Sequence, residues 1–257
     1  MKKLLVRAVI GIVILVVLVA LGIHFFLDGA IRRGVETVGS MLTKVQVKLD
    51  GASVSLLSGS GKIKGLVVGN PEGYKMPSAI QVGTAALALQ PGSIFGDKIV
   101  IRSINVQGPE ITFETDLKGN NLSKILSNLD AATGGGNAPV NTNTPSGKKA
   151  SRKLEVDDFL ITGGKIHVSV TTLGGQSATV PLPEIHLTAL GQGPDGITAA
   201  ELTKRVLQAV EKESVKAAGS AVTDLTKQAG NLSRGLGTNA TGAVESVTKG
   251  IGGLFKK

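Results

Sequence analysis

The stretch IVIRSINVQGPEITF, residues 99–113, recurs 55 positions later as LEVDDFLITGGKIHV, residues 154–168. Apolar residues occupy the same places in both copies, which makes this an internal repeat. Apolar and polar residues alternate within each copy, and this period of two is typical of a β-strand. Gly108-Pro109 and Gly163-Gly164 predict turns, so each copy is interpreted as a hairpin.

The alternation changes phase once in each copy, between Ile101 and Ile104 and between Val156 and Phe159. One extra residue there predicts a bulge, which bends a strand and returns its side chains to the original face. Both units should therefore curve alike and share one aliphatic face. The residues predicted to line it are Ile99, Ile101, Ile104, Val106, Ile111, Phe113, Leu154, Val156, Phe159, Ile161, Ile166 and Val168.

Outward from the repeat, other short segments alternate as well. We expect strands at 45–49, 54–56, 63–68 and 80–89, and a last edge strand at 180–190, where Pro181 and Pro183 fit an edge. Helical spacing predicts a short helix at 31–42, and a capped helical turn follows Asn120. About nine antiparallel strands at ~4.8 Å each would give a sheet roughly 45 Å across.

An aliphatic sheet face has two interpretations. It can be the core of a closed barrel or sandwich, or it can line an open groove that holds acyl chains. Composition alone favours the closed core, because an apolar face is normally covered.

The N-terminal region predicts a membrane anchor. Residues 8–27 contain no Asp, Glu, Lys or Arg, and about 20 apolar residues span a bilayer. A cleavable signal peptide is the alternative, but no small-residue cleavage site follows the apolar stretch. Lys2, Lys3 and Arg7 favour a cytoplasmic N-terminus and an exported body.

Two further segments flank the second repeat copy. Residues 131–151 are polar and rich in Gly, Asn, Thr and Pro, which predicts a disordered insert. From Leu207 onward, small and apolar residues follow an eleven-residue period, which predicts a long amphipathic helix. Its predicted membrane-surface residues are Leu225, Leu232, Leu236, Val247, Ile251 and Leu254. A disordered or loosely helical polar tail is an equal alternative.

Composition excludes several classes of function. The chain has no cysteine, which excludes disulfides, thiol catalysis and cysteine-ligated metals. His167 and His186 lack a third ligand at suitable spacing, so we expect no metal, no cofactor and no catalytic residues. The net charge of +9 is spread along the chain without an aromatic patch, so anionic lipid is a better partner than nucleic acid.

Three short motifs carry a resemblance when taken in order. These are Gly69-Asn70-Pro71-Glu72-Gly73-Tyr74, Gly108-Pro109-Glu110-Ile111 and Asn120-Asn121-Leu122. With the preceding anchor and strands, they resemble the AsmA family of bacterial inner-membrane proteins, akin to bridge-like lipid transfer proteins, over roughly residues 1–190. The resemblance implies a non-enzymatic periplasmic protein with a taco-shaped twisted β-sheet, whose apolar interior shields phospholipid acyl chains.

These observations predict a mainly β protein with an N-terminal transmembrane helix, an open antiparallel groove and a C-terminal helical tail. The expected divisions are an anchor at 1–28, a first groove part at 29–130, the insert at 131–151, a second groove part at 152–197 and the tail at 198–257. The expected location is the bacterial inner membrane, as a single-pass protein. Expected partners are that membrane, phospholipid, and either other envelope proteins or further copies of the chain.

Overall fold

The computed structural model describes residues 27–55, 57–116, 119–133, 152–171 and 176–235. A helix over residues 27–43, here called the leading helix, precedes the first strand. The strands are β1 (Val47–Ser55), β2 (Ser60–Gly69), β3 (Ser78–Leu89), β4 (Lys98–Gln107), β5 (Glu110–Thr115), β6 (Lys153–Thr162), β7 (Lys165–Val170), β8 (Gln176–Pro181) and β9 (Ile185–Leu190). The 3-10 helix η1 (Pro91–Phe95) and the α-helices α2 (Asn121–Thr133) and α3 (Ala199–Gly235) complete the described elements.

All nine of these strands form one sheet, but several of them lie end to end. β3 pairs with β4 through residues 84–89 and with β5 through residues 80–81, so β4 and β5 together form one bent strand. β6 with β7, and β9 with β8, are related in the same way. The predicted hairpins at Gly108 and Gly163 are therefore wrong: the chain bends at each glycine and continues in the same general direction.

The two repeat copies lie side by side in parallel, and the sequence repeat is their pairing register. Ile101 pairs with Val156, Ile104 with Phe159, and Phe113 with Val168. The expectation of a wholly antiparallel sheet is wrong at this seam. Parallel pairing needs a crossover of a dozen or more residues, and α2 with the chain up to residue 152 supplies that length.

A line of backbone bends crosses the sheet. Gly65, Gly108 and Gly163 have positive φ angles of 61°, 58° and 65°, and the pairing registers align them with Asp50 and Gly83. Glycine adopts such angles without the steric cost that a side chain imposes. The glycines thus let neighbouring strands bend at the same level, which curls the sheet.

A second irregularity confirms the bulge predicted in the first repeat copy. Leu89 pairs with Ile101 and Ala88 with Ser103, so Arg102 is the extra residue in β4. The corresponding Asp157 is likewise skipped in the ladder between β4 and β6. The apolar side chains on either side of each irregularity therefore return to one face, as the sequence pattern predicts.

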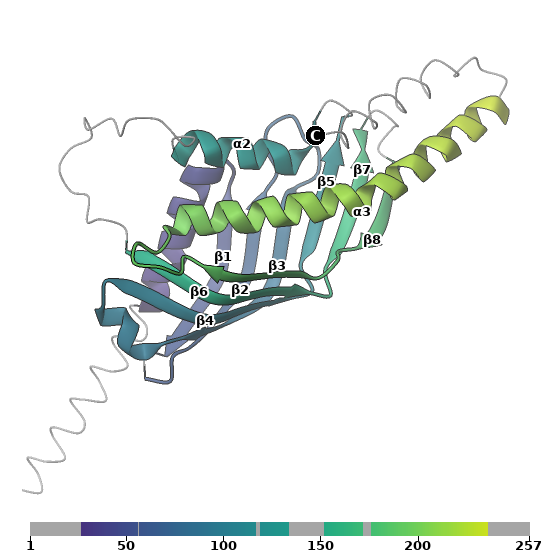
Figure 1. Cartoon of the computed structure of the whole chain (residues 1–257). Coiled ribbons are helices and arrows are strands. Elements are labelled where there is room, and N and C mark those ends of the chain that lie inside the picture. Colours follow the sequence, from purple (N-terminus) through teal and green to yellow (C-terminus); the bar gives the residue numbers. More distant parts are fainter. Residues whose placement is uncertain (1–26, 56, 117–118, 134–151, 172–175, 236–257) are drawn as a thin grey trace, which may run out of the picture.

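The sheet curls into an open half-barrel, with α2 and α3 on its concave side (Figure 1). Two long helices make this a mixed α/β architecture rather than the mainly β one expected. The sheet is also narrower than expected, because end-to-end strands share a position. Six strand positions at ~4.8 Å give a width of about 30 Å.

The leading helix runs along the free edge of β1. Asp28 Oδ1 accepts a hydrogen bond from the Val54 amide at 3.2 Å, and Ser40 Oγ accepts one from the Val47 amide at 2.8 Å. The start of this helix therefore lies beside the end of β1. Among the residues that the structure describes, no helix is long and apolar enough to cross a membrane. The predicted span at 8–27 lies outside them, apart from Leu27.

Candidate functional site: the concave apolar face

Apolar residues cross the concave face in rows, one residue from each of four neighbouring strand positions. One row joins Leu87 of β3, Ile104 of β4, Phe159 of β6 and Leu187 of β9. Another joins Ile80, Ile111, Ile166 and Val180. The regular register thus turns a sequence alternation into a continuous apolar surface.

All twelve residues predicted to line this face belong to, or pack against, one apolar cluster. Ten of them are buried, and Ile99 and Leu154 are half-buried. The cluster also contains side chains from the two helices on the concave side: Leu122 and Ile125 of α2, and Leu207, Val210, Ala218, Ala221 and Val222 of α3. Much of the predicted groove lining is therefore covered by helices of the same chain.

The cover helix α3 begins with a capping box. Glu201 Oε2 accepts a hydrogen bond from the Thr198 amide at 2.6 Å, and Thr198 Oγ1 accepts one from the Glu201 amide at 3.1 Å. The Thr198 amide also lowers the pKa of Glu201 below its usual value. The sequence therefore fixes where α3 starts.

Polar contacts join α3 to α2. Ser123 Oγ donates to Glu211 at 2.6 Å, and Lys204 Nζ lies 2.6 Å from Asp130 Oδ1. The buried stripe of α3 contains several small residues, and one of them, Ser214, is polar. Ser214 is fully buried, and its hydroxyl has no hydrogen-bond partner among the residues that the structure describes. A buried hydroxyl without a partner weakens packing.

The half of the concave face formed by β2 and β3 is less covered. Six of its apolar side chains are half-buried, whereas Val82 and Ala85 of β3 are buried, and α3 lies mainly against β5, β7, β8 and β9. The half-buried residues are Ile63, Leu66, Val68, Ile80, Leu87 and Leu89. Accessible aliphatic surface thus remains beside the cover helix.

Two of the three motifs meet in a polar cluster formed by Asn70, Asn121 and Glu114, and Glu114 lies in β5 three residues after the remaining motif. Glu114 is fully buried, and its carboxylate accepts hydrogen bonds from Asn70 Nδ2 at 2.9 Å and from the amides of Lys75 and Met76 at 2.7 and 3.0 Å. These three donors satisfy a carboxylate that would otherwise be costly to bury.

Asn121 completes this polar cluster. Its side chain donates to Asn70 Oδ1 and to the Thr112 carbonyl, and it accepts a hydrogen bond from the Glu114 amide. Tyr74 lies close by, and burial followed by repulsion from Asp116 and Glu114 raises its pKa. The cluster joins the 70–76 loop, β5 and the start of α2. In the sequence, it was indicated only by the two ordered motifs that contain Asn70 and Asn121.

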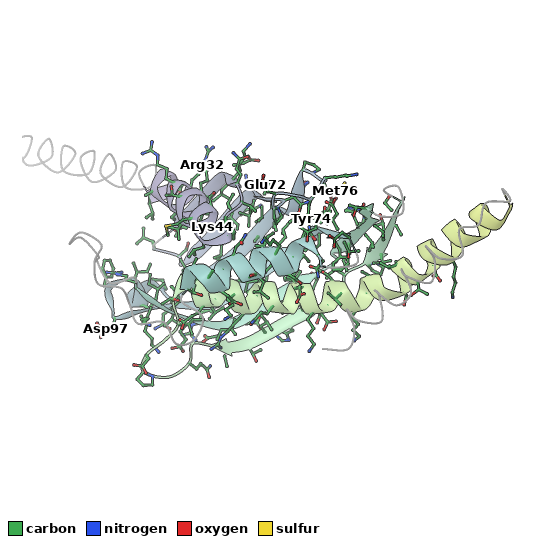
Figure 2. The ribbon with its side chains drawn as sticks, turned by 90° about the horizontal axis from the view of Figure 1, so that it is seen from above. Arg32, Lys44, Glu72, Tyr74, Met76 and Asp97 are labelled. Carbon is green, nitrogen blue, oxygen red and sulfur yellow. The ribbon has the colours of Figure 1, made fainter. Side chains whose placement is uncertain are left out.

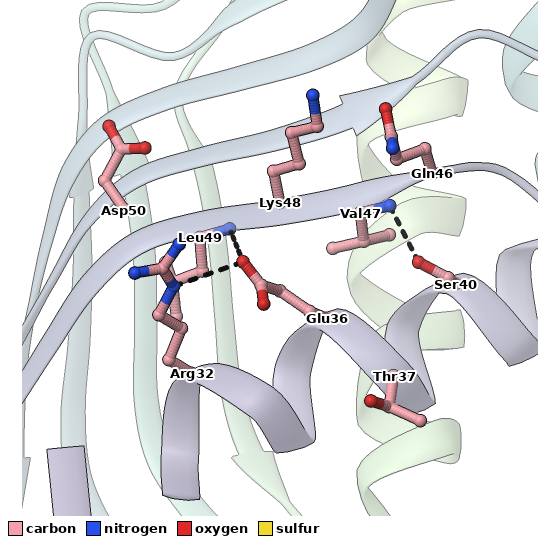
Figure 3. A pocket seen from close by; sticks show the side chains of 9 residues that line it. All are labelled: Arg32, Glu36, Thr37, Ser40, Gln46, Val47, Lys48, Leu49 and Asp50. Carbon is pink, nitrogen blue, oxygen red and sulfur yellow. Dashed lines mark hydrogen bonds and ion pairs between the residues drawn. The ribbon is translucent and has the colours of Figure 1, made fainter. Parts of the chain in front are cut away.

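A polar hollow of about 430 Å³ lies between the leading helix and β1 (Figure 3). Glu36 accepts hydrogen bonds from the Leu49 amide at 3.1 Å and from Arg32 Nε at 3.3 Å. The Leu49 amide, followed by Arg32, lowers the pKa of Glu36. These contacts satisfy edge groups of β1. The hollow is lined by Arg32, Glu36, Thr37, Ser40, Gln46, Val47, Lys48, Leu49 and Asp50.

Other predicted features lie wholly or partly outside the described residues. Residues 134–151 of the insert do so, whereas residues 131–133 form the end of α2. Leu225 and Leu232 belong to α3, and Leu236, Val247, Ile251 and Leu254 follow its described end. Residues of the eleven-residue stripe nearer the start of α3, such as Leu207, Val210 and Ala218, face the sheet.

The strand histidines do not meet. His186 Nε2 lies 2.5 Å from Asp158 Oδ1, and His167 Nδ1 lies 3.1 Å from Thr179 Oγ1. Within the described ranges, no three potential ligands are grouped around a metal position.

Comparison with protein families gives one match, to the model described as the AsmA family, over residues 1–239. This range includes the whole sheet, the polar cluster and α3. No curated protein and no solved structure matches the chain.

Proposed function

Because the chain belongs to the AsmA family, we propose that it is a membrane-anchored envelope protein that binds phospholipid acyl chains on its concave face. Proteins of this family are bacterial envelope proteins, generally non-enzymatic, with roles in lipid transport. On this proposal the chain takes part in phospholipid trafficking or outer-envelope maintenance. Its N-terminus is cytoplasmic and its sheet is periplasmic.

The observation that carries the proposal is the apolar surface shared by five strand positions, from β2 to β8 and β9. Acyl chains gain about 0.8 kcal/mol for each CH₂ group removed from water, and the described side chains of this cluster are apolar. The whole sheet is about 30 Å wide, which equals the hydrocarbon thickness of one bilayer. One copy can therefore shield a lipid but cannot connect two membranes.

The half-buried residues of β2 and β3 are the proposed first contact for an acyl chain, beside the edge of α3. Ile104 and Phe159 are buried, so an acyl chain reaches them only where the side chains packed over them move aside. Small residues make up part of the apolar stripe of α3, and the buried Ser214 hydroxyl has no hydrogen-bond partner among the described residues. Both features should make α3 pack less tightly on the sheet than an ordinary core helix does.

Native mass spectrometry of the full chain, purified in detergent, tests the proposal. Phospholipid should remain bound, and Leu87→Asp should reduce its occupancy because a carboxylate on the concave face is poorly solvated next to acyl chains. Ala86→Asp is the matched control, because the adjacent side chain is exposed on the other face. Equal lipid occupancy in both variants would contradict the proposed site.

A second candidate function is a structural envelope protein that uses the sheet as a closed core and binds protein partners. The burial of ten lining residues favours it. A cooperatively folded wild-type chain that retains no phospholipid would support this candidate over lipid binding.

A further inference from the structure

The two most exposed of the large apolar side chains in the described ranges lie on turns at one end of the sheet. Leu57, in the turn between β1 and β2, is 97% exposed, and Phe95, at the end of η1, is 86% exposed. Exposed apolar residues are common one at a time. Here two of them project from neighbouring connections.

The two turns are held against each other by backbone contacts. The Leu89 amide donates to the Gly59 carbonyl at 2.5 Å. A Cβ added to Gly59 would lie 2.2 Å from the Leu89 carbonyl oxygen and 3.1 Å from Pro91. This close approach fixes the β1–β2 turn beside η1, so Leu57 and Phe95 belong to one end surface.

The chain enters the fold at this same end. Asp28 bonds to the Val54 amide, two residues before the turn begins. The uncharged stretch 8–27 is thus joined directly to the leading helix, without an intervening linker in the sequence. A bilayer that holds residues 8–27 is therefore close to Leu57 and Phe95.

We propose that this turn end docks on the bilayer, with Leu57 and Phe95 inserted among the lipid headgroups and upper acyl chains. Arg152 donates to the Ile94 carbonyl and so places a cation beside Phe95, at headgroup level. Asp97 is exposed at the same end (Figure 2), so the apolar tips supply the attraction rather than net positive charge. Apolar side chains at a membrane surface gain free energy from the area they bury.

Docking would orient the molecule. The strands would stand with their turn end on the bilayer, and the loop that contains Met76 would point away, because β2 and β3 are antiparallel and meet that loop at their other ends. Figure 2 places Asp97 well apart from Glu72, Tyr74 and Met76. The half-buried face of β2 and β3 would then rise directly from the membrane surface.

The chain has no tryptophan, so single substitutions provide unique fluorescent reporters. Leu57→Trp, Phe95→Trp and the control Met76→Trp would be made in the full chain and reconstituted into phosphatidylcholine vesicles with ordinary or brominated acyl chains. Met76 is 39% exposed and lies at the opposite end of the strands. Circular dichroism would establish that each variant is folded.

Bromine quenches only nearby indole rings. The reporters at 57 and 95 should lose most of their emission in brominated vesicles, whereas the reporter at 76 should be unchanged. Equal quenching at all three positions, or none at 57 and 95, would overturn the docking. Contacts of these tips with a protein or a second copy would give a blue shift that needs no vesicles and is insensitive to bromine.

The docking rests on residues 8–27 holding the chain to a membrane, but not on lipid binding by the concave face. If the reporters at 57 and 95 are not quenched in a protein that still carries phospholipid, the docking proposal is refuted and the proposed lipid binding stands. If the reporters are quenched but the purified protein carries no phospholipid, lipid binding by the concave face is refuted and the docking proposal stands.

Discussion

The side-chain amide of Asn121 donates a hydrogen bond to Oδ1 of Asn70 at 2.8 Å, although the two residues are 51 positions apart. This contact brings together two of the three short motifs, and Glu114 of β5 joins them through Asn70 Nδ2. These two motifs and Glu114 therefore form a buried joint between a loop, a strand and a helix.

Replacing Asn121 should destabilise the fold strongly. Asn121→Ala leaves the Thr112 carbonyl and the Glu114 amide without their partner, and each buried unsatisfied group costs about 1–3 kcal/mol. We expect urea denaturation to report a loss of at least about 2 kcal/mol. Asn105→Ala, on the same sheet at a half-buried position, should change the free energy of unfolding much less. Equal effects would argue against the joint.

Gly65→Ala tests the line of bends across the sheet. A Cβ at this position would lie 2.0 Å from Asp50 Oδ2, at a φ of 61°, and the backbone angle alone costs a non-glycine residue roughly 1–2 kcal/mol. Thermal unfolding should therefore occur at a clearly lower temperature. Gly83→Ala is the matched control, because nothing lies within 4 Å of its added Cβ.

The same experiment separates the two causes. Adding Asp50→Gly to Gly65→Ala should restore the part of the stability that the clash removes and leave the backbone part. No recovery in the double variant would show that contact with Asp50 is not a source of the loss.

Ser214→Ala should stabilise the protein. The substitution removes a buried hydroxyl that has no hydrogen-bond partner within the described part of the chain, and alanine also favours a helix over serine by about 0.5 kcal/mol. Ser220→Ala, at an exposed position of α3, measures the helix preference alone. We expect the gain at 214 to exceed that at 220 by about 1 kcal/mol in urea denaturation. A destabilised Ser214→Ala would mean that the hydroxyl contributes to packing.

Glu36 should make the attachment of the leading helix depend on pH. Its pKa is lowered in the folded protein from the usual 4.5, so the ionised form stabilises the fold above that pH, and the contribution is lost as pH falls through the folded pKa. Hydrogen exchange of the Leu49 amide should accelerate in Glu36→Gln at neutral pH. Wild type and variant should converge in acid. A difference that persists unchanged in acid would exclude the carboxylate as its source.

Most strand segments, and the burial of the twelve predicted residues in or against one apolar cluster, were predictable, because alternation and the 55-residue repeat record them directly. The predicted strand at 180–190 is instead divided between β8 and β9. Parallel pairing was not, because a positive-φ glycine such as Gly108 serves equally in a hairpin turn and in a bend. A hairpin and a bend at Gly108 differ only in which distant strands pair on either side of it. The identities of Gly108 and Pro109 do not indicate that pairing.

The cover helix and the polar cluster show a similar limit. The eleven-residue stripe correctly indicates a long amphipathic helix, but small residues such as Ala218 and Ala221 suit a lipid surface and a sheet equally well. Glu114 has no periodic signal, since its burial depends on donors from Asn70 and from the backbone of a distant loop. In the sequence, only Asn70 and Asn121 of this cluster belong to the short motifs, and nothing shows that these motifs meet.

Because of the parallel seam between the repeat copies, the two halves of the sheet can form one after the other. β1 to β5 pair through neighbouring connections, so this half of the sheet can assemble while β6 to β9 are still being synthesised. Closing the seam joins segments about 55 positions apart, and long-range closure of this kind slows folding. Until α3 follows, the first half exposes aliphatic surface and the unpaired edge of β4, a state in which the nascent chain is prone to aggregation.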